Sequence, residues 1–211
     1  MTELFKSMIA GDSPAAGTVE VVAPFDLSPI ARIETSDGDV VDQALETAHR
    51  LFRDKGRWLS KAQRIAILEK TIHIMAQQAE NLAVEAAQEG GKPLIDSRVE
   101  VTRAIDSIRI CVDCLRTESG STIPMGVNAA SSGKLAFTTQ EPIGVVVAVS
   151  AFNHPLNLIT HQVGPAIAAG CPVIVKPATD TPLSCFRFVE MVREAGLPDE
   201  WCQALVTDSR D

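Results

Sequence analysis

Three short apolar segments, separated by two helical ones, constrain the fold of this chain more than any other feature of its sequence. The apolar segments are residues 145–149, 172–176 and 202–206. The first is so continuously aliphatic that it predicts a strand buried on both faces. The segments between them, 155–169 and 182–195, have the apolar spacing of helices, and a glycine follows each. We therefore predict a β-α-β-α-β unit with a parallel sheet and right-handed crossovers.

The part of the chain that precedes this unit has a helical pattern from about residue 37 to residue 117. A stripe of apolar residues follows Asp37, and Ser60 is placed to cap a second helix. A third helix is expected to end at the Gly90-Gly91 pair, and a fourth continues to residue 117. We interpret the charged residues of these helices as solvated faces.

Non-helical segments lie on both sides of the helical part. Two short runs, 19–23 and 30–34, predict a small β-ribbon before the helices. Residues 118–132 are rich in Gly, Ser, Thr and Asn, which indicates a loop or an extended arm. The following run, 135–140, predicts a strand with one more polar side.

Composition excludes several classes of function. The formal net charge is −8, from 19 basic and 27 acidic residues, which argues against a nucleic-acid or acidic-membrane partner. No apolar run reaches the roughly 18 residues that span a bilayer, and the amino terminus lacks the apolar stretch of a signal peptide. The five cysteines are an odd number in apolar or helical surroundings. We interpret them as reduced thiols and expect a cytoplasmic protein.

Ligands of open parallel sheets bind beyond the carboxyl ends of the strands. Here that rule selects residues 150–155 and 176–180. If the two strands are neighbours, Asn153 and Lys176 emerge at the same edge, where an amide can donate to a developing oxyanion and an ammonium suits ribose hydroxyls or phosphate. Each also has a simpler explanation, because Asn153 could cap the helix at Pro155 and Lys176 could be a solvated strand end.

Five motifs around these positions, in a fixed order, carry more specific information. They are Glu141-Pro-Ile-Gly-Val-Val-Val-Ala-Val, Asn153-His-Pro, Gly164-Pro-Ala-Ile-Ala-Ala-Gly-Cys-Pro-Val-Ile-Val-Lys-Pro, Thr181-Pro-Leu and Glu194-Ala-Gly-Leu-Pro. Together they resemble the aldehyde dehydrogenase superfamily, strongly from residue 135 to 206 and more loosely from 39 to 117, where Arg64 and Glu89-Gly-Gly-Lys-Pro-Leu look like family landmarks. No G-x-G-x-x-G follows the first strand, so spacing by itself does not predict nucleotide binding.

The resemblance implies a role for each matched position and NAD or NADP as the cofactor. Asn153 matches the asparagine whose amide helps to hold the thiohemiacetal oxyanion. Lys176 matches the lysine that contacts the adenosine ribose. The residues Ser150, Ala151 and Phe152 match positions that line the nicotinamide and pyrophosphate pocket.

Three positions depart from the commonest family pattern. Phe152 and His154 stand in Ala-Phe-Asn-His-Pro, where Pro-Trp-Asn-Phe-Pro is commonest. His154 either shapes the substrate tunnel or packs as a neutral side chain. Thr179 stands where many members carry a glutamate that accepts from the ribose 2′-hydroxyl. A neutral threonine does not repel a 2′-phosphate, so our hypothesis is that the parent enzyme tolerates NADP as well as NAD.

The resemblance also divides the chain into parts. Residues 1–117 match the amino-terminal helical part of the coenzyme-binding domain, 118–142 the oligomerisation arm and 143–211 the β-α-β-α-β coenzyme-binding segment. The predicted fold class is α/β, a partial Rossmann-like parallel sheet preceded by a helical layer and a β-arm, with the catalytic domain absent. The arm and an open sheet edge after Val206 both predict a homo-oligomer.

None of the cysteines sits in the family's nucleophile motif. Cys111 and Cys114 form a lone C-x-x-C on a helix, for which packing is favoured over zinc, so we expect no metal site. We therefore expect the coenzyme-binding portion of an NAD(P)-dependent aldehyde dehydrogenase, which would oxidise an aldehyde to a carboxylic acid and be inactive in this form alone. The alternatives are a truncated, non-catalytic protein that binds nucleotide or pairs with another subunit, and a CoA-acylating member of the superfamily.

Overall fold

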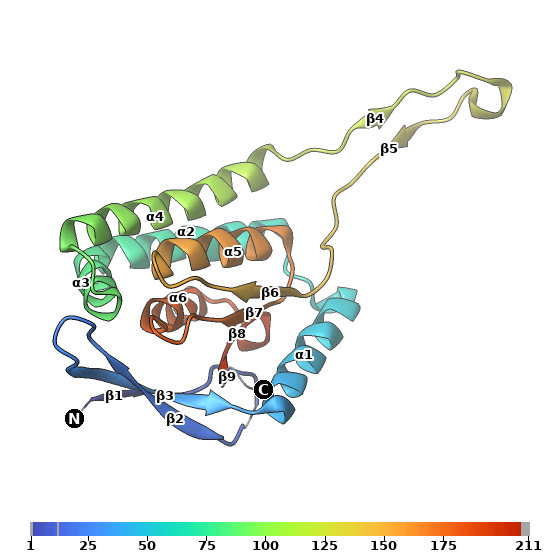
Figure 1. The fold of residues 1–211 in the computed structure, drawn as a ribbon. Coiled ribbons are helices and arrows are strands. Elements are labelled where there is room, and N and C mark those ends of the chain that lie inside the picture. Colours follow the sequence, from blue (N-terminus) through green and yellow to red (C-terminus); the bar gives the residue numbers. More distant parts are fainter. Residues whose placement is uncertain (1, 12, 208–211) are drawn as a thin grey trace.

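The three apolar segments form the predicted parallel sheet, in the order β6-β7-β8 (Figure 1). The computed structural model describes residues 2–11 and 13–207 of the chain. Within them, the sheet consists of β6 (Val146–Val149), β7 (Val173–Lys176) and β8 (Cys202–Ala204), all parallel. This confirms the β-α-β-α-β unit, because the two connections are helices.

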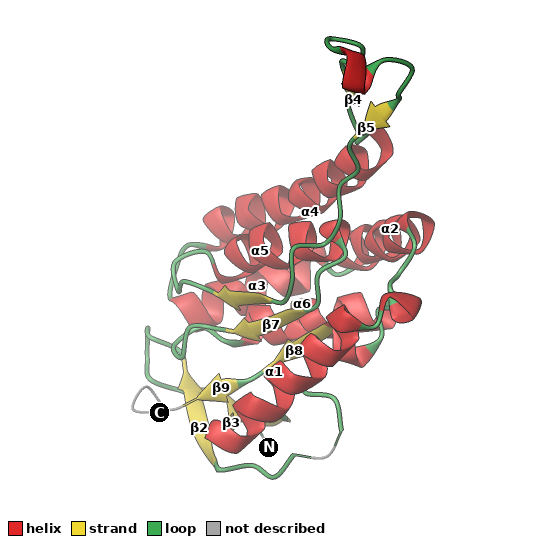
Figure 2. Cartoon of the chain, turned by 90° about the vertical axis from the view of Figure 1, so that its right-hand side faces the viewer, coloured by secondary structure: helices red, strands yellow, loops and turns green. Residues whose placement is uncertain are grey.

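The two faces of this sheet are covered unequally (Figure 2). Helices α5 (Pro155–Ala169) and α6 (Leu183–Glu194) pack on one face, and α1 (Gly38–Arg53) packs against β7 on the other. Val147 and Val149 on β6 are 56% and 60% exposed. The prediction that this run is buried on both faces is therefore wrong. The reason is that α5 covers one face of β6, while alternate side chains point to the other face, where α1 packs on β7 and leaves Val147 and Val149 exposed.

The predicted helical layer is present and packs against α5 and α6 (Figure 1). It consists of α2 (Lys61–Gln77), α3 (Ala79–Gly90) and α4 (Leu94–Thr117). Ser60 caps α2 as predicted, in a capping box with Gln63. The left-handed residue that ends α3 is Gly91, with φ of 61°, as the glycine pair indicated.

Helices α4 and α5 pack closely because Gly164 on α5 has no side chain at their contact. A methyl group at Gly164 would stand only 2.7 Å from Ile108 Cδ1. Two glutamates face inward from this layer, and Glu89 and Glu100 are 0% and 1% exposed. The interpretation of every charged helical residue as part of a solvated face is wrong at these two positions, because each carboxylate accepts hydrogen bonds from the start of a helix in the next layer.

A second sheet contains the predicted ribbon and two strands that the sequence pattern does not predict. The ribbon formed by residues 17–22 and 29–36 is antiparallel. The short strand at residues 206–207 pairs in parallel with the strand at 29–36, with Val206 opposite Thr35. Residues 208–211, which end the predicted coenzyme-binding segment 143–211, lie outside the described residues. The strands are β1 (Glu3–Phe5), β2 (Gly17–Val22), β3 (Pro29–Ser36) and β9 (Val206–Thr207).

This second sheet changes where the open edge lies. Met8 forms an antiparallel bridge with Ala204, and β9 continues into the second sheet, so the chain around Val206 is paired. The prediction of an open edge after Val206 is wrong. Among the described strands of the parallel sheet, β6 pairs only with β7, whereas β8 pairs with β7 and also bridges to Met8 at Ala204. The unpaired backbone therefore lies at β6.

The arm projects away from the body of the molecule (Figure 1). Its two strands, β4 (Thr122–Ile123) and β5 (Ala136–Phe137), pair in antiparallel fashion, so the strand predicted for 135–140 is shorter than expected. Single-turn 3-10 helices complete the chain: η1 (Lys55–Arg57), η2 (Ala129–Ser131) and η3 (Asp199–Trp201). Among the described helices, none combines the length and apolar character needed to cross a membrane.

Candidate coenzyme and oxyanion site

The loop after β6 lies beside the carboxyl end of β7. Val149 is the register partner of Lys176, and the Ser150 N–H donates to the Lys176 carbonyl over 3.0 Å. Ser150 is buried, whereas Ala151 and Phe152 are exposed. The structure thus brings the residues selected by the strand-end rule to one edge of the sheet.

Asn153 presents its side chain from this loop without a hydrogen bond to any described residue. The simpler explanation, that it caps α5, is wrong. The N-cap position belongs to His154, whose side chain makes no capping bond. The backbone N–H groups of Leu156 and Asn157 donate instead to Glu100 Oε1, over 2.9 and 3.0 Å. The exposed Asn153 amide is therefore free to serve a ligand.

A cavity of about 440 Å³ opens beside Asn153 and reaches α4. Lys92 and Glu100 form an ion pair in its wall, and His154 Nδ1 lies 3.6 Å from Glu100 Oε2. His154 therefore lines this cavity and also contacts a buried carboxylate, so it shares features of both roles considered for it. Glu100 was missed by sequence reasoning, although it falls on the same helical face as Val101 and Ala104.

A second cavity, of about 460 Å³, lies between α1 and the uncovered sheet face. Its walls are mostly aliphatic, Lys176 supplies its cation, and Asp42 on α1 supplies a carboxylate. Lys176 is half-buried and makes no ion pair or side-chain hydrogen bond with a described residue. An apolar surface with one free ammonium can hold a planar base and the ribose hydroxyls beside it. Thr179 follows on the exposed loop after β7.

Glu89 holds the start of α6 in the same way that Glu100 holds the start of α5. Its carboxylate accepts from the backbone N–H groups of Leu183 and Ser184, over 2.7 and 3.0 Å, and from the Ser184 hydroxyl. Burial raises the pKa of Glu89 to about 7, even though these donors lower it. The first-turn amides of α6 are therefore satisfied by a side chain nearly a hundred residues away in sequence.

Three of the five cysteines are unsuited to nucleophilic attack because they are buried. Burial raises the pKa of Cys111 to about 11 and that of Cys202 to about 12, and it raises the pKa of Cys185 further. Cys171 is also buried, and Cys114 is an exposed thiol on α4. The raised pKa of Cys111, Cys185 and Cys202 keeps these three thiols protonated near neutral pH. The reactive form of a cysteine is the thiolate, so these three are poor nucleophiles. Among the described residues, no group of three or more His, Cys, Asp or Glu is arranged to hold a metal.

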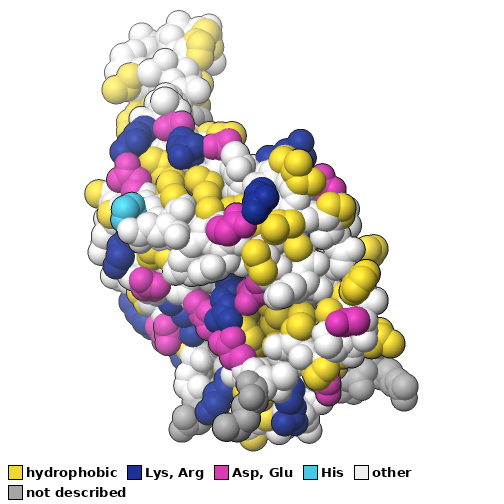
Figure 3. Space-filling view, turned by 90° about the vertical axis from the view of Figure 1, so that its left-hand side faces the viewer, with side chains coloured by type: hydrophobic (Ala, Val, Ile, Leu, Met, Phe, Trp, Pro, Cys, Tyr) yellow, Lys and Arg dark blue, Asp and Glu magenta, His cyan; other side chains and the backbone are white. Residues whose placement is uncertain are grey.

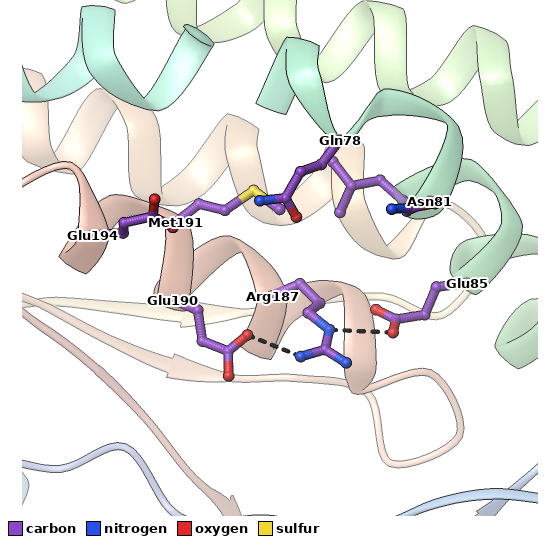
Figure 4. A pocket seen from close by; sticks show the side chains of 8 residues that line it. Gln78, Asn81, Glu85, Arg187, Glu190, Met191 and Glu194 are labelled. Atoms are coloured by element: carbon purple, nitrogen blue, oxygen red, sulfur yellow. Dashed lines mark hydrogen bonds and ion pairs between the residues drawn. The ribbon is translucent and has the colours of Figure 1, made fainter. Parts of the chain in front are cut away.

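A third cavity, of about 300 Å³, is lined by charged side chains of α3 and α6 (Figure 4). Its single arginine, Arg187, is paired with Glu85, Glu190 and Glu3. Burial raises the pKa of Glu85 more than Arg187 lowers it. Because the guanidinium already has three carboxylate partners, this cavity offers no free cation to a phosphate. On the face drawn in Figure 3, acidic and basic side chains are likewise intermixed.

Comparisons with known proteins identify the family. A family model described as the aldehyde dehydrogenase family matches residues 11–211. An NADP/NAD-dependent aldehyde dehydrogenase of Escherichia coli is 36% identical over 197 residues, which are 90% of this chain and 39% of that protein. A 3-sulfolactaldehyde dehydrogenase of Priestia megaterium is 33% identical over 196 residues, which are 93% of this chain and 40% of that protein.

Solved structures agree with the sequence comparison. Aldehyde dehydrogenase 21 from Physcomitrella patens, solved with the reaction product succinate, superimposes with a TM-score of 0.92 at 29% identity; the match covers 100% of this chain and 44% of that one. Glyceraldehyde-3-phosphate dehydrogenase from Methanocaldococcus jannaschii, complexed with NADP, gives a TM-score of 0.84 at 27% identity, over 94% and 42% of the two chains. This chain thus spans about two fifths of the length of these proteins, and it belongs to the aldehyde dehydrogenase family.

Proposed function

We propose that the complete protein is an NAD(P)-dependent aldehyde dehydrogenase, which oxidises an aldehyde to a carboxylic acid, and that this chain is its coenzyme-binding part. One observation carries the proposal: the amide of Asn153 and the ammonium of Lys176, neither of which has a side-chain partner among the described residues, lie at neighbouring strand ends. The first suits an oxyanion and the second suits a ribose. Family membership supports the same pairing of roles.

The residues around Lys176 fit a dinucleotide. The aliphatic walls of the cavity suit the adenine ring, and the Lys176 ammonium can donate to the ribose hydroxyls. Ser150, Ala151 and Phe152 are proposed to line the nicotinamide and pyrophosphate end. Bound NAD or NADP supplies the hydride acceptor for the reaction. The exposed Thr179 adds no negative charge near the ribose, which favours acceptance of both coenzymes.

Asn153 is the proposed catalytic residue of this chain. Its amide donates to the oxyanion that forms when a thiolate adds to the aldehyde carbonyl. The nucleophilic cysteine and the glutamate base are proposed to come from the part of the relatives' length that this chain does not span. This assignment is supported by the raised thiol pKa of Cys111, Cys185 and Cys202.

The arm is proposed to pair subunits of a cytoplasmic homo-oligomer. Most apolar side chains of the arm are exposed in the described chain. A hairpin that stayed in solvent would not require apolar side chains, so their exposure favours contact with another subunit. The exposed apolar residues of the arm are Ile123, Val127, Leu135 and Phe137.

Titration with NAD and NADP tests the coenzyme site. We expect the full-length gene product to bind the two coenzymes with dissociation constants within tenfold of each other. We expect Lys176→Ala to weaken both by about tenfold, since a hydrogen bond to a charged group contributes about 1.5 kcal/mol. Lys134→Ala is the matched control, because Lys134 is an exposed arm lysine without an ion pair in the described chain.

Substitution of Thr179 isolates the specificity part of this test. Thr179→Glu places a carboxylate where a 2′-phosphate would lie, so it should weaken NADP and leave NAD within about threefold. A preference for NAD of more than tenfold in the unsubstituted protein would contradict the dual-coenzyme hypothesis. Unchanged binding of both coenzymes in Lys176→Ala would contradict the site itself.

A further inference from the structure

Three backbone groups of the loop that carries Asn153 are hydrogen-bonded to other parts of the chain, while the Asn153 side chain bonds to no described residue. On its amino-terminal side, the Ser150 N–H donates to the Lys176 carbonyl. The Thr181 hydroxyl donates to the Phe152 carbonyl over 3.3 Å. At the centre, Lys92 Nζ donates to the Asn153 carbonyl over 3.3 Å. A fixed backbone with an unpartnered amide is the arrangement that preorganised catalysis requires.

The carboxyl-terminal side of the loop is held by Glu100. Because α5 begins with Pro155, which has no N–H, its first free donors are the amides of Leu156 and Asn157. Both donate to Glu100 Oε1, whose side chain is fully buried. The loop supplies no local cap for them, so α4 determines where α5 starts.

Lys92 joins these two anchors. Its ammonium pairs with the second oxygen of the Glu100 carboxylate and donates at the same time to the Asn153 carbonyl. The Lys92 side chain is 14% exposed, so little water competes for it. His154 Nδ1 also approaches Glu100 Oε2, at 3.6 Å. One ion pair from the helical layer therefore contacts the backbone of Asn153 itself and the residues that follow it.

We infer that Lys92 and Glu100 are positioning residues that fix the Asn153 amide for the oxyanion. This inference rests on the proposed function, because it assigns the pair a role in that same reaction. The Lys92 contact holds the carbonyl of Asn153, and the Glu100 contacts hold the first amides of α5. Loss of the Lys92 contact leaves the Glu100 acceptor in place for the α5 amides, so it loosens Asn153 without removing the helix cap.

The experiment compares three lysine variants of the full-length gene product. Lys92→Met removes the ammonium and keeps most of the chain length, and Lys92→Arg keeps a cation. Lys70→Met is the matched control, because Lys70 Nζ likewise donates to a backbone carbonyl, that of Glu194, far from the loop. We expect Lys92→Met to lower kcat for aldehyde oxidation at least tenfold, with the coenzyme KM within about twofold. Lys92→Arg and Lys70→Met should stay within about threefold of the unsubstituted protein.

A kcat for Lys92→Met within twofold of the unsubstituted enzyme would overturn the inference. So would a parallel loss of kcat, coenzyme binding and unfolding free energy, which would show a structural role alone. Hydrogen exchange gives a readout that does not require turnover: in Glu100→Gln the amides of Leu156 and Asn157 should stay protected, and in Glu100→Ala they should lose protection. Equal protection in both variants would also overturn the inference.

If the unsubstituted protein oxidises no aldehyde, the proposed function fails. The Asn153 side-chain amide resonances of Lys92→Met then decide the positioning claim. They shift if the loop moves, and unchanged resonances would overturn the inference.

Discussion

Replacing Asn153 by alanine is expected to lower kcat for aldehyde oxidation by about 100- to 1,000-fold in the full-length gene product. The reason is that its amide is the proposed oxyanion donor, and removal of such a donor costs about that much in rate. Since the Asn153 side chain bonds to no described residue, its removal should leave the free energy of unfolding nearly unchanged. Steady-state kinetics and urea unfolding measure the two quantities on the same preparation.

The control for this substitution is another exposed asparagine. Asn81 lies on α3 beside the Arg187 cavity, away from the loop (Figure 4), so Asn81→Ala should retain kcat within about twofold. A loss of less than about fivefold in Asn153→Ala would contradict the assigned role. A large loss accompanied by a comparable loss in unfolding free energy would point to a folding effect instead.

Glu89→Gln is expected to become more stable relative to the unsubstituted chain as the pH rises from about 5 to 8. The pKa of Glu89 is raised from 4.5 to about 7 in the folded chain, chiefly by burial. The folded state therefore holds the proton more tightly than the unfolded state. The stabilisation from this proton is fully present below about pH 4.5 and is lost as the pH rises through 7, by about 3 kcal/mol in total.

Urea unfolding at pH 5, 6, 7 and 8 measures this difference, with Glu46→Gln as the control. Glu46 is an exposed glutamate on α1, so its substitution should give a difference in unfolding free energy that does not change with pH. A pH-independent difference for Glu89→Gln would contradict the raised pKa. A decrease in its relative stability with pH would show that the α6 amides and Ser184 lower the pKa of the carboxyl more than burial raises it.

The parallel sheet and its helices were predictable because their signals are local. Apolar runs, helical spacing and terminal glycines place β6, β7, β8, α5 and α6 without knowledge of the rest of the fold. The exposure of Val147 was not predictable, because it depends on which element covers that face of β6. The strands β1 and β9 are three and two residues long, too short to show a period, and their pairing with β3 is set by tertiary contacts.

The candidate site divides in the same way. The strand-end rule brought Asn153 and Lys176 together from strand order alone. It did not reveal Glu100, because a charged residue on a helix is ordinarily solvated and the amides that it accepts from are 56 and 57 residues further along the chain. The cause is physical: a buried carboxylate is stable only where donors converge, and convergence is a property of the packed layers.

The central claim is that this chain contributes a coenzyme wall and an oxyanion donor but no nucleophile. Aldehyde-dependent reduction of NAD or NADP by the purified 211-residue chain, free of any longer form, tests it most directly. No turnover above the uncatalysed rate is predicted, because burial keeps Cys111, Cys185 and Cys202 protonated and none of the five cysteines sits in the family's nucleophile motif. Turnover that is lost on substitution of any of the five cysteines would contradict the claim.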